Sequence, residues 1–381
     1  MKKTTLTVQA GGHDRRYCPV TAVLEEQGGA SEGIVLKEKG TGCEVPCQWE
    51  ETKDGARLWW ILDNLSAGQE RAYEVSEGEP SACECGVTCA EKEDRIVVEI
   101  GGGAFTSYHF GASWARPFLY PLLGPYGLPM TRRLAAPEDK DMDHHHHRSF
   151  WVAHGEVNEV DNWSEGEGHG RTVHRSFDAL TEGPVLAHIC ALGDWVSRGG
   201  EKVLEEHRCL RIYNLPDWCR IVDMVVVLTA TEQDVLFGDT KEGGIASVRV
   251  TPSMEVRDTG KIENAYGGIN EGETWGKRAV WCDYSGWVHG RQVGLALFDH
   301  PDSFRFPTYW HVRDYGLMTA NPFGLSFFKN DPNQRGDYTL KQGDSMRLRY
   351  RLYLHPGDAR EGNVAEKYHD FVNPPVVYVA K

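Results

Sequence analysis

The chain has 381 residues, a hydrophobic content of 40% and a formal net charge of -15. This length allows one large domain with a small appendage, and the negative charge repels polyanions, so nucleic acid is not an expected partner. No apolar run approaches the roughly twenty residues that span a bilayer, and no apolar leader follows the first residues. We therefore expect a soluble, cytoplasmic protein with no membrane partner, and its oligomeric state stays open.

The chain contains ten cysteines, and Cys83, Cys85 and Cys89 lie in one short stretch. In a cytoplasmic protein we expect free thiols rather than disulfides. The spacing within this trio differs from the two-residue spacing of zinc knuckles, so it does not favour a metal site.

Strand-like segments begin near the N-terminus. Short alternating runs broken by Gly-rich turns occur at residues 6–8, 20–24 and 58–62. They predict a small β-sandwich over residues 1–90. Residues 78–86 are rich in Gly, Pro, Ser and Glu, and we interpret them as its boundary.

From residue 95 onward strands dominate the pattern. The runs lie at residues 96–100, 108–110, 185–192, 202–213, 222–229, 245–250, 279–282, 293–298 and 346–354. Helical periodicity is clear only over residues 364–372. Many long strands predict an all-β fold for residues 91–381, with two large antiparallel sheets stacked as a supersandwich.

The densest group of titratable side chains is the run Asp-His-His-His-His-Arg at residues 143–148. Its position deep in the chain excludes an expression tag. In an extended strand alternate side chains share a face, so the run would place His144 and His146 together. Because imidazole titrates near neutrality, the run predicts a functional segment, with a solvated polar loop as the alternative.

Other segments between the strands combine aromatic, basic and acidic residues in the same way. They cover residues 116–129, 151–170, 237–244, 275–286 and 307–324. Segments of one composition predict a shared cleft. Aromatic faces cover the C–H faces of a sugar ring and charged groups bind its hydroxyls, so this lining favours a sugar or glycoside as the partner. No nucleotide-binding glycine motif is present.

Several of these segments carry a family resemblance. The matching pieces include Ala115-Arg-Pro-Phe-Leu-Tyr-Pro, Asp143-His-x-His-His-Arg-Ser, Gly238-Asp-Thr-Lys-Glu-Gly and Tyr309-Trp-His-Val-Arg-Asp-Tyr-Gly. With them, residues 108–381 resemble a bacterial family labelled methane oxygenase PmoA, often found among carbohydrate-utilisation genes. That family has Pro at the position of His145, which implies that the other three imidazoles matter. Its architecture is similar to the galactose-mutarotase-like supersandwich.

We therefore expect a carbohydrate-active enzyme, a glycoside hydrolase or lyase that acts on a glycoside, keto-sugar or uronate. An imidazole of the run would act with a carboxylate, either Glu165 or Glu242. The expected catalytic residues are His144, His146, His147, Glu165, Lys241, Glu242 and His311. The expected substrate-binding residues are Arg116, Tyr120, Arg148, Trp151, His154, Asp239, Trp275, Lys277, Tyr309 and Arg313.

Two alternatives stay open. In the first, His144, His146 and His311 hold a divalent metal that acts as a Lewis acid on the substrate. No other cofactor is expected. In the second, the protein binds a sugar without transforming it, although such a protein would need fewer titratable groups.

Overall fold

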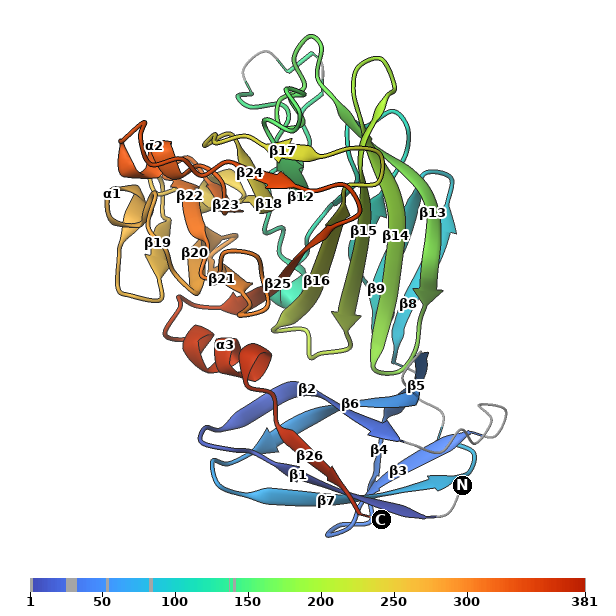
Figure 1. Cartoon of the computed structure of the whole chain (residues 1–381). Helices are drawn as coiled ribbons and strands as arrows, with labels where there is room; N and C mark the ends of the chain where they lie inside the picture. Colours follow the sequence, from blue (N-terminus) through green and yellow to red (C-terminus); the bar gives the residue numbers. More distant parts are fainter. Residues whose placement is uncertain are drawn as a thin grey trace.

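Two eight-stranded antiparallel sheets form the body of the molecule, and a smaller β unit lies beneath them (Figure 1). The computed structural model describes residues 3–24, 33–52, 55–81, 85–136, 138–139 and 142–380. Among these residues, the helical elements are α1 (Asn270–Thr274), α2 (Leu325–Lys329), α3 (Val364–Val372) and 3-10 turns at Pro125–Gly127 and Pro252–Met254. The expected all-β supersandwich with a small N-terminal β domain is confirmed.

The first large sheet is called the site sheet here, and the second is called the cover sheet. In spatial order the site sheet contains β22 (Tyr309–Arg313), β23 (Leu317–Asn321), β18 (Gly243–Arg249), β12 (Phe150–His154), β11 (Phe118–Leu119), β10 (Gly103–His109), β9 (Arg95–Ile100) and β8 (Val87–Lys92). The cover sheet contains β13 (Arg171–Thr181), β14 (Leu186–Val196), β15 (Lys202–Tyr213), β16 (Arg220–Thr229), β25 (Ser345–Pro356), β21 (Arg291–Asp299), β20 (Trp281–Val288) and β19 (Lys261–Asn264). Strands β17 (Val235–Phe237) and β24 (Tyr338–Leu340) pair separately.

The main apolar core lies between these two sheets. Ile96 and Val98 enter it from the site sheet, and Ile189 and Leu210 enter it from the cover sheet. Each fully buried aliphatic side chain contributes roughly 1.5–3 kcal/mol to folding. Because side chains alternate along a strand, the residues between these positions lie on the outer faces of the sandwich. Both clusters described below are built on such outer faces.

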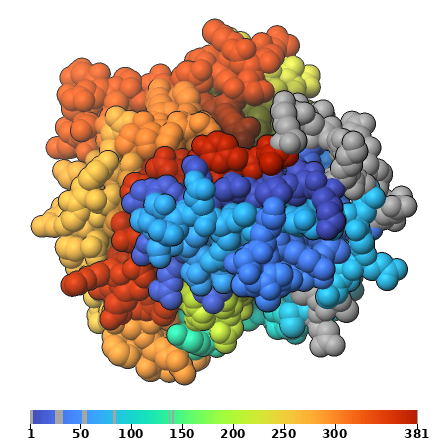
Figure 2. All heavy atoms as spheres, turned by 90° about the horizontal axis from the view of Figure 1, so that it is seen from below, coloured from blue at the N-terminus to red at the C-terminus, as the bar shows by residue number. Residues whose placement is uncertain are grey.

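The small unit contains a five-stranded and a three-stranded sheet. The larger sheet is formed by β26 (Val376–Val379), β1 (Thr4–Gln9), β7 (Glu70–Glu77), β3 (Ile34–Glu38) and β4 (Glu44–Val45), and the smaller by β2 (Arg15–Leu24), β6 (Gly55–Leu65) and β5 (Cys47–Thr52). Strand β26 comes from the C-terminus and pairs with β1, so that Leu6 lies opposite Val379. Figure 2 shows these red C-terminal residues lying along the blue N-terminal ones.

The expected division at residue 90 stays a prediction about independent folding. A cut at that residue would fall inside β8, which belongs to the site sheet. It would also leave β26 without its partner strand, and an unpaired edge strand favours aggregation. The expected boundary segment includes residues 82–84, which lie outside the described residues.

Contacts from β5 and β6 join the small unit to the cover sheet. The side-chain oxygen of Gln48 accepts hydrogen bonds from the backbone N–H groups of Val185 and Leu186, at 3.1 and 2.9 Å. The ring of Trp59 lies 6.4 Å from that of Tyr213. The two units therefore share buried surface at this junction.

Two strands differ from the sequence pattern. Strand β13 is the edge of the cover sheet, and most of its side chains are half-buried or exposed, so it lacks an apolar repeat. Strand β12 is short and buried on both faces, which removes the alternation that marks a strand. No helix among the described residues is long and apolar enough to cross a bilayer.

The expectation of free thiols is wrong for one pair. Cys190 on β14 and Cys209 on β15 form a disulfide. The two residues lie directly opposite each other in the strand register, which brings their side chains together on one face. Cys18, Cys219 and Cys282 are buried thiols, as expected.

Candidate active site

A row of side chains crosses the outer face of the site sheet. His311 on β22 lies opposite Thr319 on β23, and Thr319 lies opposite Ser247 on β18. Ser247 in turn lies opposite Trp151 on β12. Trp310, the neighbour of His311, points into the core and is fully buried there. The pairing therefore brings segments that are far apart in the sequence together on one surface.

The histidine run forms a turn above this row rather than a strand. His144 has a φ of 45°, and the N–H of His147 donates to the carbonyl of His144 at 3.0 Å. The expected grouping by strand alternation is therefore wrong. The imidazoles of His144, His146 and His147 lie 4.6 to 5.9 Å apart. Within the run, His145 turns aside, and its Nε2 donates to the carbonyl of Asp139 at 3.0 Å.

Four aromatic rings stack in sequence and fix the orientation of two imidazoles. Tyr315 stacks on His144, with ring centroids 4.9 Å apart. His144 stacks on His147 at 4.8 Å, and His147 stacks on Trp151 at 5.3 Å. Stacked rings hold one another in plane, so rotation of these imidazoles is restricted.

Charged groups support the stack from one side. Arg249 is 1% exposed, and its guanidinium donates to Nδ1 of His147 at 3.2 Å and to Asp143 at 3.1 Å. Asp143 also lies 3.1 Å from Nδ1 of His144. Although burial raises the pKa of Asp143, the positive charge of Arg249 and hydrogen bonds outweigh it and lower that pKa. Because Nδ1 of His144 contacts Asp143, Nε2 is the nitrogen of this imidazole that remains for proton transfer.

A second charged group anchors the loop that follows β12. Arg116 donates to Glu165 at 3.1 Å and to the carbonyls of Asn162 and Trp163 at 3.1 and 3.0 Å. Arg148 also binds the Glu165 carboxylate with two nitrogens. Burial raises the pKa of Glu165, but the Arg148 hydrogen bond and the two cations reverse this and lower it. Glu165 therefore stays ionised and positions the loop.

This arrangement changes two expected roles. Arg116, expected to bind substrate, is 3% exposed and lies beneath the surface. Burial lowers the pKa of Arg116 to about 10, so it remains cationic at neutral pH. Glu165, expected as a catalytic partner, has its carboxylate occupied by two guanidinium groups. Of the two expected carboxylates, Glu242 is the one that lines the cleft.

The cleft is a hollow of about 360 Å³ above the histidine turn. His144 and His146 line one part of it, and Trp163 adds an aromatic face. Its carboxylates are Glu156, Glu159, Asp161 and Glu242. The cleft thus combines imidazole, carboxylate and indole, which come from three separate segments of the chain.

Three imidazoles at the histidine turn and beneath it have lowered pKa values. Burial, with the positive charge of Arg116, lowers the pKa of His146 to about 4. Burial also lowers the pKa of His147 well below its usual value. The pKa of His311 falls to about 3 through burial and the charges of Lys241 and Arg313. These three imidazoles are therefore neutral near pH 7.

Three expected catalytic or binding residues, Lys241, Arg313 and His311, lie near one another but do not line the cleft. Lys241 forms an ion pair with Glu242. Arg313 forms one with Glu271 at 3.0 Å, and its guanidinium lies over the ring of Tyr315 at 5.3 Å. His311 is 1% exposed and accepts a hydrogen bond from Nε1 of Trp275 at 2.9 Å. His311 and Trp275 therefore support the site from below.

Other expected binding residues lie away from the cleft. His154 is fully buried, and its Nε2 donates to the carbonyl of Gly238 at 2.9 Å. Asp239 is also buried and accepts backbone hydrogen bonds from Ser326 and Gly336, so it holds loops together.

The remaining three expected residues are also distant. Tyr309 stacks on Phe328 near α2, with ring centroids 5.6 Å apart. Lys277 is exposed in the loop after α1. Tyr120 packs at the edge of the aromatic cluster beneath the cleft, beside Trp151 and Trp163.

The expected metal ligands do not form a donor set. Among the described residues, the one group of three or more donors whose ligand atoms all lie within 4.8 Å of one another is His188, Cys190 and Cys209. His144, His146 and His311 are not such a group, and Nδ1 of His311 is already bonded to Trp275. The geometry therefore disfavours a metal held by this trio.

Two residues of the site were missed in the sequence. Arg249 interrupts an apolar strand, and a charged side chain inside such a run signals a buried ion pair. Tyr315 lies within the expected segment at residues 307–324, but it was not singled out there, and only the structure shows that it stacks on His144.

Comparison with known proteins identifies the family. A model described as a family of unknown function, DUF6807, matches residues 95–369. The chain belongs to this family. The methane oxygenase PmoA label expected from the motifs has no support in the comparisons. No curated protein matches the sequence.

Three solved structures are similar in general architecture. An α-mannosidase from Enterococcus faecalis V583 has a TM-score of 0.47 at 11% identity, and the similarity covers 100% of this chain and 46% of that one. A glycosyl hydrolase family 38 protein from Enterococcus faecalis has a TM-score of 0.45 at 10% identity, covering 100% and 48%. A galactose 1-epimerase from Lactobacillus acidophilus NCFM has a TM-score of 0.35 at 9% identity, covering 71% and 98%.

This chain spans about half the length of the two Enterococcus faecalis proteins. None of the three likenesses transfers a residue role or an activity to this chain.

Proposed function

We propose that this protein is a carbohydrate-active enzyme, a hydrolase or lyase of a glycoside, keto-sugar or uronate, and that its active site is the cleft above the histidine turn. The observation that carries the proposal is the composition of that cleft. Two imidazoles, several carboxylates and an indole face one hollow of about 360 Å³. Binding alone does not require so many titratable groups at one point.

His146 is the residue we assign as general base. Its pKa of about 4 leaves the imidazole neutral at pH 7, and it lines the cleft. A neutral imidazole accepts a proton from an attacking water in hydrolysis, or from the carbon beside a carboxylate in elimination. In both reactions the proton moves to the ring nitrogen of His146, the C–O bond to the leaving group breaks, and the leaving oxygen takes a proton from solvent.

Glu242 is the carboxylate we assign as its partner. It lines the same cleft, and Lys241 holds it in an ion pair. An anionic carboxylate here would stabilise positive charge that develops at the anomeric carbon, or orient a sugar hydroxyl. Trp163 is only 2% exposed, so we assign it to the wall of the cleft rather than to stacking on the sugar.

The test is turnover of defined carbohydrates by the full chain. A panel of aryl glycosides, keto-sugars and uronate oligosaccharides would be assayed for released reducing ends and for the ultraviolet absorbance of unsaturated products. We expect one class to be turned over, and Glu242→Gln to lower kcat by about 10²-fold or more while binding is retained.

The matched control is Glu232→Gln, because Glu232 is exposed in a turn outside the cleft. This variant should keep the activity of the unchanged chain. Sugar binding measured by calorimetry with no turnover of any panel member would support a binding protein instead and would contradict the enzyme proposal.

A further inference from the structure

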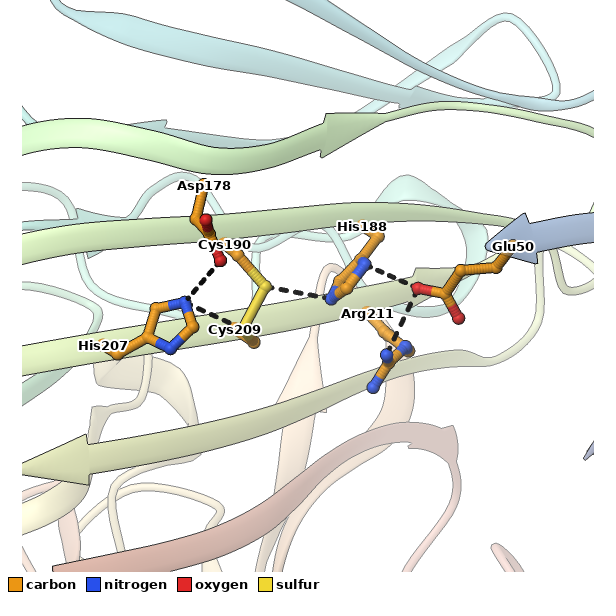
Figure 3. Close-up of a disulfide and its surroundings, with 7 residues drawn as sticks. All are labelled: Glu50, Asp178, His188, Cys190, His207, Cys209 and Arg211. Carbon is orange, nitrogen blue, oxygen red and sulfur yellow. Dashed lines mark hydrogen bonds and ion pairs between the residues drawn. A yellow bond between two sulfur atoms is a disulfide. The ribbon is translucent and has the colours of Figure 1, made fainter. Parts of the chain in front are cut away.

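A second histidine cluster lies on the outer face of the cover sheet, away from the cleft. The sequence repeats the pattern His-x-Cys, at His188 and Cys190 on β14 and at His207 and Cys209 on β15. Residues two apart on a strand share a face. The strand register then sets Cys190 opposite Cys209 and places the two imidazoles on either side of the sulfurs (Figure 3).

Both imidazoles direct a nitrogen toward sulfur. Nε2 of His188 lies 3.0 Å from the sulfur of Cys190. Nε2 of His207 lies 3.6 Å from the sulfur of Cys209 and 3.4 Å from a carboxylate oxygen of Asp178 (Figure 3). The sulfurs of a disulfide carry no hydrogen, so they cannot donate to a nitrogen lone pair. The oxidised form therefore leaves the lone pair of His188 without a hydrogen-bond donor among these sulfurs. Once the two sulfurs are reduced, a metal ion bound between them would use this lone pair.

A carboxylate sets the tautomer of His188. Nδ1 of His188 lies 2.9 Å from Glu50 on β5, so this nitrogen donates and Nε2 keeps its lone pair. Glu50 is itself held by Nε1 of Trp59 at 2.8 Å and by Arg211 at 3.4 Å. Metal-binding histidines characteristically have such a carboxylate behind them.

We propose that reduction of the Cys190–Cys209 disulfide creates a site for a zinc-type divalent cation at the junction of the two β units. The three ligands would be both thiolates and Nε2 of His188, whose donor atoms all lie within 4.8 Å of one another. His207 lies beside Cys209 and is the candidate for a fourth ligand. Thiolate with imidazole is the donor set that tetrahedral zinc prefers.

The site forms in two steps, reduction of the disulfide and then binding of the metal ion. A dithiol reductant transfers two electrons and two protons, so that the protein S–S bond becomes two thiols and the reductant becomes a disulfide. Metal binding then releases both thiol protons to solvent, and two thiolates neutralise the dication. Zinc–sulfur bonds of about 2.3 Å in a tetrahedron separate the sulfurs by about 3.8 Å, which the two freed side chains reach by rotating apart.

The experiment uses the full chain in two states, with Co²⁺ as a spectroscopic probe for zinc. Protein with the disulfide intact is compared with protein reduced by a dithiol and freed of reductant without oxygen. We expect the reduced chain to bind Co²⁺ with thiolate charge-transfer and tetrahedral visible bands that Zn²⁺ abolishes. The oxidised chain should not give those bands from this site.

Substitutions of the proposed ligands and of Glu50 test where the metal ion binds. Cys209→Ser should remove the bands that depend on this site, and His188→Ala should weaken Co²⁺ binding at least tenfold. Glu50→Gln should weaken binding by about 10- to 100-fold, because it removes the group that orients His188. The matched control is Cys89→Ser, a half-buried cysteine on β8, which should bind as the unchanged chain does.

Three outcomes would overturn the proposal. The first is a reduced chain that binds no Co²⁺, or a disulfide that resists reduction while the chain stays folded. The second is equal binding by the oxidised chain. The third is binding by Cys209→Ser that equals that of Cys89→Ser. If circular dichroism shows that Cys209→Ser is unfolded, His188→Ala and Glu50→Gln decide the question, because both leave the strand pairing and the thiols in place.

Discussion

The molecule contains two histidine clusters built in different ways. In the cleft, consecutive histidines in a turn bring His144, His146 and His147 together. On the cover sheet, alternate positions of two paired strands bring His188 and His207 to one disulfide. The turn produces ring stacking, whereas the strands produce contacts between nitrogen and sulfur.

The surroundings of the clusters explain their different chemistry. Burial lowers the pKa of His146 and His147, and the positive charges of Arg116 and Arg249 lower it further, so these two imidazoles are neutral at pH 7. His188 donates instead to the Glu50 carboxylate, which orients the ring so that its other nitrogen faces the sulfurs. The same side chain is therefore directed to different chemistry by the charge of its partner.

The largest expected effect is the loss of stability when the arginine that anchors each histidine cluster is removed. Arg116→Ala should lower the free energy of unfolding by about 3–5 kcal/mol, because it leaves Glu165 and buried carbonyls without their cation. The corresponding change on the cover sheet, Arg211→Ala, should cost about 0–1 kcal/mol, because Arg211 is partly exposed and its distance to Glu50 is 3.4 Å. Urea unfolding measures both. Equal losses would contradict the difference in anchoring.

The next effect concerns the cover sheet alone. Cys209→Ser should lower the free energy of unfolding by about 3 kcal/mol, since the disulfide closes a loop with a sequence separation of 19. Reducing the unchanged chain should cost the same amount, and added Zn²⁺ should restore part of it. A stability of the reduced chain that does not respond to Zn²⁺ would count against the metal site.

The third effect is the pH dependence of the cleft. The pKa of His311 is about 3 in the folded chain, through burial and the charges of Lys241, Arg313 and His144, against an ordinary value of 6.5. The unfolded chain therefore binds the proton first, and stability falls as pH drops below about 6.5. Between pH 7 and pH 5 this one group should cost about 2 kcal/mol.

The variant His311→Gln should remove that contribution, because Gln accepts the Trp275 hydrogen bond without titrating. The control is His289→Asn on the exposed turn between β20 and β21, where the φ of 47° suits Asn. Denaturant unfolding at both pH values makes the comparison. A His311→Gln chain that loses as much stability as the unchanged chain would contradict the assignment.

Much of the sheet architecture could be predicted from the sequence. Strand β15 and helix α3 have the bounds expected from periodicity, because each has one clearly buried side. Strand β13 was missed because an exposed edge strand does not need apolar alternation. The return of β26 to the N-terminal sheet is a long-range pairing, and no local pattern encodes it.

The candidate site was predictable in composition but not in geometry. The histidine run lies at the candidate cleft, which is lined by His144, His146 and Glu242. Arg116 and Glu165 form a buried ion pair that anchors a loop and does not line the cleft. Their burial could not be read from the sequence alone. The repeated His-x-Cys pattern was visible in the sequence, but its meaning depends on the register that sets Cys190 opposite Cys209.

The most direct test of the central claim compares two neighbouring histidines. His146→Ala and His145→Ala change adjacent positions of one turn, but His146 lines the cleft and His145 donates to Asp139 outside it. On the substrate found in the panel, His146→Ala should lower kcat/KM by about 10²- to 10⁴-fold, and His145→Ala should stay within a few-fold of the unchanged chain. Equal values of kcat/KM for the two variants would contradict the assignment of the cleft as the active site.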